Sequence, residues 1–160
     1  MEKSMNKLKD VVAYICEKYP IKSELSKSRL VKLVYLSDWF SAVIFNKPLT
    51  KTDWLFNHYG PYVDEIIDSL QDDPSFNVNS TYNSYGTSKY LISYCGGRKI
   101  NLEPQEIKLI EAVINKTKGM YYNEFIDYVY STYPVQVSNR YSKLNLTQLA
   151  QEYNSKNSIN

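Results

Sequence analysis

The residues that could carry out chemistry in this sequence are few, and they do not form a recognisable catalytic set. The chain contains one histidine, His58, and two cysteines, Cys16 and Cys95. Nucleophilic catalysis needs a base beside a nucleophile, and a zinc site needs ligands at a recognisable spacing. Neither pattern is present, and no glycine-rich phosphate-binding motif is present either. We therefore expect a protein that is not an enzyme and that uses no metal and no cofactor.

His58 lies in the segment LFNHYGPYVDEII, which has the features of a loop followed by the start of a helix. Pro61 predicts the first helical turn, where the missing N–H of proline costs nothing and its φ is preset. Gly60 before it allows a backbone turn that a residue with a Cβ resists. Asp64 and Glu65 then fall near the positive end of the helix dipole. Their position in a helix start explains these acids without a catalytic role.

The spacing of the apolar residues predicts a mainly helical protein with several amphipathic segments. The segment SKSRLVKLVYLSDWFSAVIF is apolar on nearly all sides, so we expect it in the centre of the domain. Ser26 is its expected N-cap, and Asn46, Lys47 and Pro48 end it. Further helices are predicted before Pro20, after Pro61, from Pro104 to Lys118, over 121–133 and over 145–153.

Between the third and fourth of these helices the apolar period changes from 3.6 to 2, which is typical of β-strands. Strands are predicted at 76–82 and 89–95, with a polar loop between them. Gly96 and Gly97 predict a second hairpin turn, with RKINL at 98–102 returning as a third strand.

The expected fold class is therefore mainly α (α+β), with one helical domain over residues 1–153. A small antiparallel β insertion of two or three strands occupies about 75–102, and 154–160 is predicted to be a disordered tail. A chain of 160 residues is long enough for one domain with a core. It has no apolar stretch of the roughly 18 residues that a membrane span needs, and no secretion signal. These features and the scarcity of cysteine predict a cytoplasmic location.

The charge is small overall but unevenly distributed, with a net charge of +2. Residues 1–32 carry eight basic and four acidic groups, 33–80 carry two and seven, and 81–160 carry nine and six. The three balances are therefore +4, −5 and +3, and such polarity can steer a partner. A basic cluster beside a helix start also leaves a DNA-binding regulator open as an alternative; it comprises Lys22, Lys27, Arg29 and Lys32.

Tyrosine is unusually abundant, with 16 residues in 160. Tyrosine offers a rigid amphipathic contact surface and is enriched at protein interfaces. Several tyrosines cannot all be core residues and favour a protein partner, namely Tyr82, Tyr85, Tyr121, Tyr122, Tyr128, Tyr130, Tyr133 and Tyr141.

The run KLVYLSDWFSAVIFNKPLTKTDWLFNHYGPYVDEI, residues 32–66, resembles the Panacea domain, the SocA-like antitoxin domain. The resemblance rests on a Lys-Leu-x-Tyr-Leu helix, a Pro-Leu step, a tryptophan and a Tyr-Gly-Pro loop. These features are Lys32, Leu33, Tyr35, Leu36, Pro48, Trp54, Tyr59, Gly60 and Pro61. The chain departs from the family in having Tyr62 directly after Gly-Pro, where the family commonly has valine.

This resemblance implies an antitoxin that neutralises a toxin by direct stoichiometric binding, with the toxin encoded in the same operon. Related domains occur in phages and prophages, so a phage counter-defence protein that acts on a host protein is a further alternative. The residues implied to contact the partner are Tyr35, Asp38, His58, Tyr59 and Tyr62. The residues implied to have a structural role are Lys32, Trp54, Gly60 and Pro61. Tyr35 and Trp54 are alternatively core residues.

Overall fold

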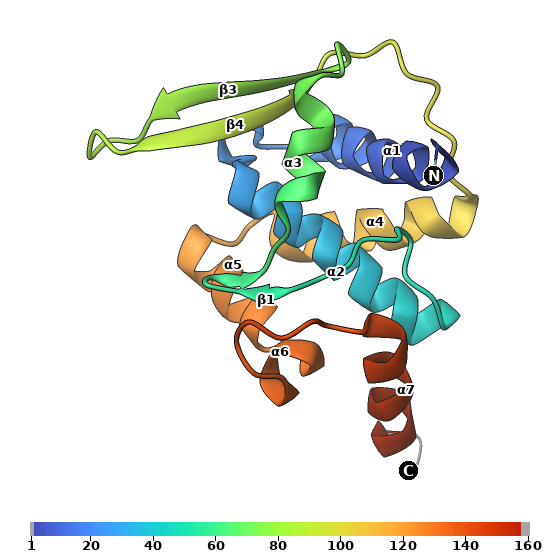
Figure 1. Cartoon of the computed structure of the whole chain (residues 1–160). Helices are drawn as coiled ribbons and strands as arrows, with labels where there is room; N and C mark the ends of the chain where they lie inside the picture. Colours follow the sequence, from blue (N-terminus) through green and yellow to red (C-terminus); the bar gives the residue numbers. More distant parts are fainter. Residues whose placement is uncertain (1, 158–160) are drawn as a thin grey trace.

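A computed structural model describes residues 2–157 (Figure 1). The helices are α1 (Glu2–Lys18), the 3-10 helix η1 (Lys22–Glu24), α2 (Lys27–Phe45), α3 (Asp64–Gln71), α4 (Pro104–Thr117), α5 (Tyr122–Tyr130), α6 (Tyr133–Val137) and α7 (Leu146–Asn157). Two antiparallel pairs of strands accompany them: β1 (Phe56–Asn57) with β2 (Gly60–Pro61), and β3 (Phe76–Tyr82) with β4 (Ser88–Tyr94). The predicted class, mainly α with a small β insertion, is confirmed.

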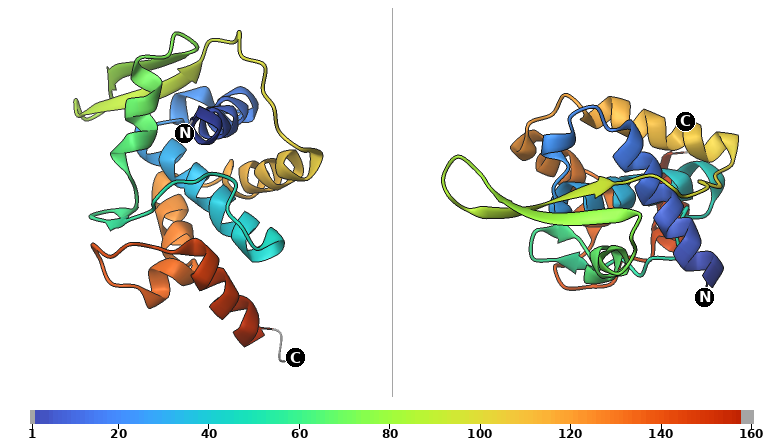
Figure 2. Two further views of the ribbon diagram at one scale, coloured as in Figure 1. Left: turned by 45° about the vertical axis from the view of Figure 1, so that its right-hand side comes forward. Right: turned by 90° about the horizontal axis from the view of Figure 1, so that it is seen from above.

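Helix α2 is the central element of the fold, as its apolar sequence predicts. It contacts α1, α3, α4, α5, α7 and β4, and it runs through the middle of the molecule (Figures 1 and 2). The predicted boundaries are also confirmed. The Ser26 side chain accepts a hydrogen bond from the backbone N–H of Arg29 at 3.1 Å, and Asn46 ends the helix in the left-handed conformation. Helix α2 is buried along most of its length; Lys27 and Ser28 at its beginning are half-buried, and Ile44 and Phe45 at its end are exposed.

The β3–β4 hairpin projects from the helical body beyond α3 (Figure 2). Its register pairs Phe76 with Tyr94 and Tyr82 with Ser88, which confirms the two predicted strands. Strand β4 also pairs with the residues before α2, since the backbone N–H of Ile92 donates to the carbonyl of Leu25 at 3.1 Å. This bond attaches the hairpin to the beginning of α2.

The predicted third strand at 98–102 is wrong. Gly96 and Gly97 do have positive φ, but they lead into an extended connection to α4 and not into a paired strand. Side chains hold this connection, since Arg98 Nε lies 3.2 Å from a carboxylate oxygen of Asp10. The alternating pattern of RKINL therefore reflects contacts with the helices on one side.

The C-terminal region differs from the prediction in two places. The helix expected over 121–133 ends at Tyr130, and α6 follows as a separate turn with Pro134 at its beginning. Helix α7 continues to Asn157, and the Nδ2 of Asn154 donates to the carbonyl of Val43 at 3.0 Å. The predicted disorder is therefore wrong for residues 154–157, because this bond holds the last turn on α2. The rest of the predicted tail, 158–160, lies outside the described residues.

Candidate functional site

The candidate site begins at the tight turn that joins β1 to β2. Asn57 pairs with Gly60, so His58 and Tyr59 form the two-residue loop between them. Gly60 has a φ of +108°, and a Cβ there would lie 3.2 Å from Cε1 of Tyr130 and 3.5 Å from Cε of Lys32. Only glycine satisfies both the backbone conformation and this close approach.

The prediction that Pro61 occupies the first turn of a helix is wrong. Pro61 lies in β2, and α3 begins three residues later at Asp64, with Val63 as its N-cap. The fixed φ of proline is compatible with a short edge strand as well as with a helix start, and the pairing with β1 selects the strand. The predicted location of Asp64 and Glu65 in the first turn of α3 is confirmed.

A distant segment, residues 141–144, supports the turn from behind. The backbone N–H of Phe56 donates to the carbonyl of Ser142 at 2.9 Å, and that of Leu144 donates to the carbonyl of Trp54 at 2.8 Å. The hydroxyl of Tyr141 lies 3.0 Å from Nδ1 of His58. This added pairing fixes the position of the turn relative to the helices.

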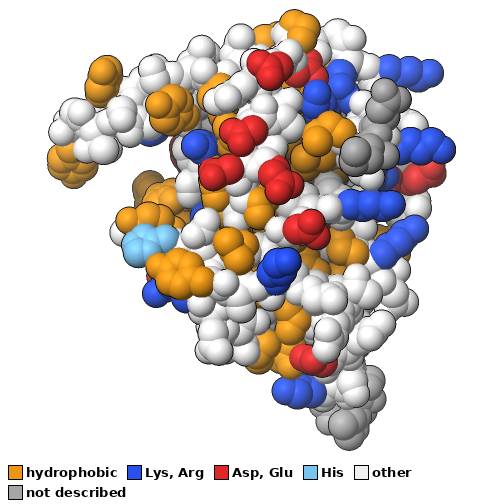
Figure 3. Space-filling view, in the orientation of Figure 1, with side chains coloured by type: hydrophobic (Ala, Val, Ile, Leu, Met, Phe, Trp, Pro, Cys, Tyr) orange, Lys and Arg blue, Asp and Glu red, His pale blue; other side chains and the backbone are white. Residues whose placement is uncertain are grey.

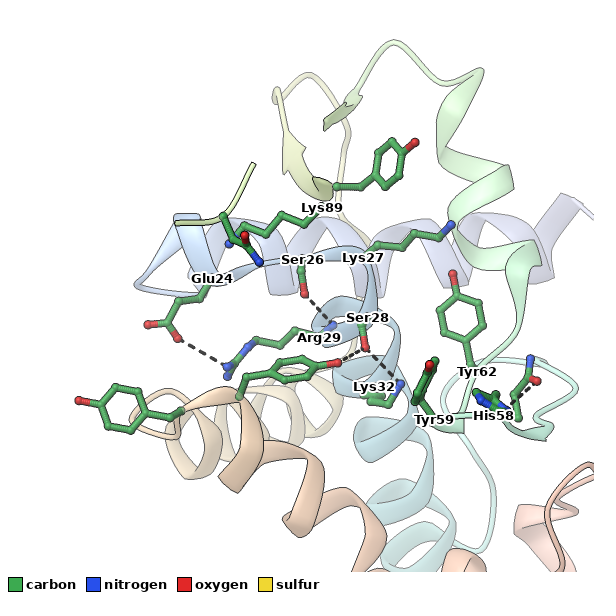
Figure 4. A pocket seen from close by; sticks show the side chains of 15 residues that line it. Glu24, Ser26, Lys27, Ser28, Arg29, Lys32, His58, Tyr59, Tyr62 and Lys89 are labelled. Carbon is green, nitrogen blue, oxygen red and sulfur yellow. Dashed lines mark hydrogen bonds and ion pairs between the residues drawn. The ribbon is translucent and has the colours of Figure 1, made fainter. Parts of the chain in front are cut away.

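In front of the turn lies a cleft of about 830 Å³ (Figure 4). Four segments form its walls: the first turns of α2, the β1–β2 turn, the β3–β4 hairpin and the beginning of α5. Five tyrosines contribute to its lining: Tyr59, Tyr62, Tyr90, Tyr121 and Tyr122. Figure 3 shows hydrophobic side chains around the histidine on this side of the molecule, and acidic side chains over α3.

The cleft is also cationic. Lys27, Arg29, Lys32 and Lys89 line it together with one acid, Glu24. Arg29 is buried, and its Nη1 donates to the hydroxyl of Tyr19 at 3.1 Å and to the carbonyl of Met120 at 3.2 Å. Its Nε has no hydrogen-bond partner within the described residues.

Lys32 is the most unusual charged group of the site, because only 1% of its surface is exposed. Its ammonium donates to the hydroxyl of Ser28 at 3.3 Å and lies 5.6 Å from the ring centre of Tyr62. Within residues 2–157 no carboxylate forms an ion pair with it. Burial therefore lowers the pKa of Lys32 from 10.5 to about 8.

Tyr62, whose ring lies beside Lys32, carries a second incompletely satisfied group at the far end of that ring (Figure 4). Its hydroxyl is buried without a hydrogen-bond partner in the part of the chain that the structure describes. Burial, followed by the charges of Asp64 and Asp68, raises the pKa of Tyr62 to about 12. The hydroxyl is therefore protonated at neutral pH and is a free donor.

Two of the predicted contact residues are wrong, because Tyr35 and Asp38 are completely buried. The Tyr35 ring packs edge-on against Trp54 at 5.5 Å between ring centres, so the alternative that both are core residues is correct. Asp38 accepts hydrogen bonds from the backbone N–H of Thr50 at 2.9 Å and from Nε1 of Trp54 at 2.9 Å. Burial raises the pKa of Asp38 to about 6, although these hydrogen bonds oppose the increase. Asp38 therefore fixes the 48–54 segment on α2.

The other predicted contact residues, His58, Tyr59 and Tyr62, do meet at the cleft. Lys32, expected to be structural, lies at its floor between α2 and the turn (Figure 4). The sequence did not show that Ser28, Tyr90, Tyr121 and Tyr122 belong to the same site, although Tyr121 and Tyr122 were expected to favour a protein partner. The only signals for them were the basic cluster at 22–32 and the excess of tyrosine.

The fold and site together describe a small, mainly helical domain with a tyrosine-rich cationic cleft formed around a Tyr-Gly-Pro turn. Residues 30–134, well over half of the chain, match the family described as antitoxin SocA-like, Panacea domain. The chain belongs to this family, which supports an antitoxin-like role. Comparisons with curated proteins and with solved structures gave no match.

No helix within residues 2–157 is both long and apolar enough to cross a membrane. Nor do the histidine, cysteine and acidic side chains of that range form a group of three that could hold a metal ion.

Proposed function

We propose that this protein is an antitoxin that neutralises a toxin by direct, stoichiometric binding through the tyrosine-lined cleft. The observation that supports the proposal most strongly is the location of the family's Tyr-Gly-Pro turn. The turn forms one wall of the cleft, and Tyr59 at its tip is 71% exposed. A residue with that exposure, in a turn that is hydrogen-bonded to the 141–144 segment, is suited to insertion into a partner.

The surface around the turn has the composition of a protein interface. Tyr121 is 81% exposed, and Tyr90 and Tyr122 are also exposed at the cleft. Tyrosines lose little conformational entropy on binding and bury a large area each. A specific complex of this kind buries about 1,200–2,000 Å² in total, which the cleft and the adjoining tyrosines of α5 and the hairpin can supply. The surplus of cations favours an acidic partner surface.

The proposal extends to the genetic context, in which the toxin is encoded beside this protein in a phage, prophage or bacterial operon. The regulator alternative receives no support from the fold, because α2, the strongest candidate recognition helix, is buried. The counter-defence alternative differs from the antitoxin proposal only in its target, which is a host protein and not a toxin. The binding experiment below distinguishes the two by identifying the captured protein.

The experiment is co-expression with each neighbouring gene product, followed by growth rescue and by affinity purification at moderate salt. We expect one neighbouring protein to be toxic alone, to be neutralised by this chain and to co-purify with it in fixed stoichiometry. The double variant Tyr59→Ala/Tyr121→Ala should lose rescue, whereas Tyr85→Ala, a matched change at a 90% exposed tyrosine of the hairpin loop, should retain it.

Three results would contradict the proposal. They are the absence of any interacting neighbour, rescue that is insensitive to the double variant, and recovery of nucleic acid without a protein. The last result would favour the regulator, and capture of a host protein by a phage-encoded chain would favour counter-defence.

A further inference from the structure

We propose that the floor of the cleft binds the phosphate group of a small phosphomonoester that also carries a planar ring, as a mononucleotide does. This inference goes beyond toxin neutralisation and does not depend on it, because it concerns a ligand of the isolated protein. It is carried by the arrangement of Lys32, Ser28 and Tyr62 at the bottom of a cleft that is large enough for such a molecule.

The floor of the cleft holds a charge that has no ion-pair partner among the described residues. The Lys32 ammonium is buried, and its one hydrogen-bond partner is the neutral hydroxyl of Ser28 at 3.3 Å. A buried ammonium is costly unless an anion compensates it, and no described side chain supplies one. An anionic ligand group beside Lys32 would supply the missing charge.

Several residues that line the cleft carry further donors. The hydroxyl of Tyr62 is buried without a partner, and Nε of Arg29 is in the same condition. The Ser28 hydroxyl, 2.8 Å from that of Tyr122, can donate in the same region. Phosphate presents three terminal oxygens and up to two charges at neutral pH, so one such group can accept from both the Lys32 ammonium and the Ser28 hydroxyl beside it.

The charge of the walls agrees with a dianion. Four cations and one acid line the cleft, a balance of +3, and the acid, Glu24, lies 3.7 Å from Nη2 of Arg29. The N-terminus of α2 also lies in the cleft wall, so its dipole adds to the positive potential there. Lys89 reaches the cleft from β4 and Lys27 from the first residue of α2 (Figure 4).

Tyrosine rings form much of the apolar lining of the cleft. Tyr59 and Tyr122 line both the main cleft and an adjoining pocket of about 250 Å³. Aromatic side chains stack on nucleobases with little regard to base identity. The main cleft, at about 830 Å³, falls within the roughly 300–1,000 Å³ that is usual for small-molecule sites. The rings therefore suit the planar part of the ligand, and Lys32 suits its phosphate.

The test uses the full-length isolated protein with AMP as the probe, and adenosine and inorganic phosphate as comparisons. Binding is followed by NMR of isotope-labelled lysine side chains and by calorimetry. We expect saturable AMP binding that shifts the Lys32 signals, with weaker binding of adenosine and of phosphate alone. Lys32→Met should reduce AMP affinity by about 30-fold or more, as expected for removal of one member of a buried charged pair.

Lys108→Met provides the matched control, since Lys108 is exposed on α4 and lies outside the cleft lining. It should leave AMP affinity unchanged, and thermal unfolding of both variants shows that they are folded. The proposal is overturned if AMP causes no saturable change at millimolar concentration, if adenosine binds as well as AMP, or if Lys32→Met binds AMP normally. A shift of the Lys32 signals by a protein partner but not by AMP would likewise overturn the assigned ligand class.

Discussion

Replacing Lys32 with methionine should stabilise the isolated protein, because the change removes a buried charge that no acid compensates. Burial lowers the pKa of Lys32 from 10.5 to about 8. At about 1.4 kcal/mol per pKa unit, retaining the charge costs the folded state about 3 kcal/mol at neutral pH. The variant loses the hydrogen bond to Ser28 and the contact with the Tyr62 ring, which are worth about 1 kcal/mol each. The expected net gain is therefore about 1–2 kcal/mol.

The pH dependence gives this prediction a distinctive signature. The pKa of Lys32 is lower in the folded state than in the unfolded chain, so the unfolded chain binds more protons between about pH 8 and 10.5. Lys32 therefore makes the stability of the protein rise with pH in that window. The cost of burying the Lys32 charge is fully present below about pH 8. It decreases between pH 8 and 10.5 and is lost above that, where the unfolded chain is uncharged at this position too. The advantage of Lys32→Met over the native chain should therefore be largest near pH 7 and should shrink by pH 9.5.

The assay is denaturant unfolding of the native chain, Lys32→Met and the exposed control Lys108→Met at both pH values. The control should differ from the native chain by no more than about 0.5 kcal/mol. If Lys32→Met is less stable than the native chain at pH 7, or if its advantage does not change with pH, then Lys32 has a compensating partner and the reasoning about the cleft floor is incorrect.

Three further substitutions test other parts of the structure. Gly60→Ala should destabilise the fold by about 1–3 kcal/mol in thermal unfolding, because alanine is strained at a φ of +108° and its Cβ approaches Tyr130. Asp38→Ala should cost about 2–4 kcal/mol in denaturant unfolding, because the N–H groups of Thr50 and Trp54 lose their buried acceptor. His58→Ala should change growth rescue only as far as it changes co-purification of the toxin, because His58 lines the binding cleft; a folded variant that binds the toxin normally but no longer rescues growth would contradict a non-catalytic role.

The elements were largely predictable because they depend on local periodicity. The near-continuous apolar character of α2 predicted its central position, and the change of period predicted β3 and β4. The errors fall where one local signal fits two structures. Pro61 suits an edge strand as well as a helix start, and only its pairing with Phe56, which is in turn held by the 141–144 segment, decides between them.

The site was less predictable because its parts are far apart in the sequence. The cleft brings together residues near 28, 59, 90 and 122, and no spacing rule connects them. The same helix also carries residues of opposite roles: Asp38 is satisfied by Thr50 and Trp54, whereas Lys32 is left without an acid. A helix that is apolar on nearly all sides gives no periodic signal to separate these roles.

The central claim, that this antitoxin-family protein acts through its tyrosine-lined cleft, is tested most directly by amide hydrogen exchange. The measurement compares the free protein with its complex with the neutralised partner. The account predicts that slowed exchange is concentrated at the β1–β2 turn, the first turn of α2 and the beginning of α5. Unchanged exchange there, with protection confined to α4 or α7, would contradict it.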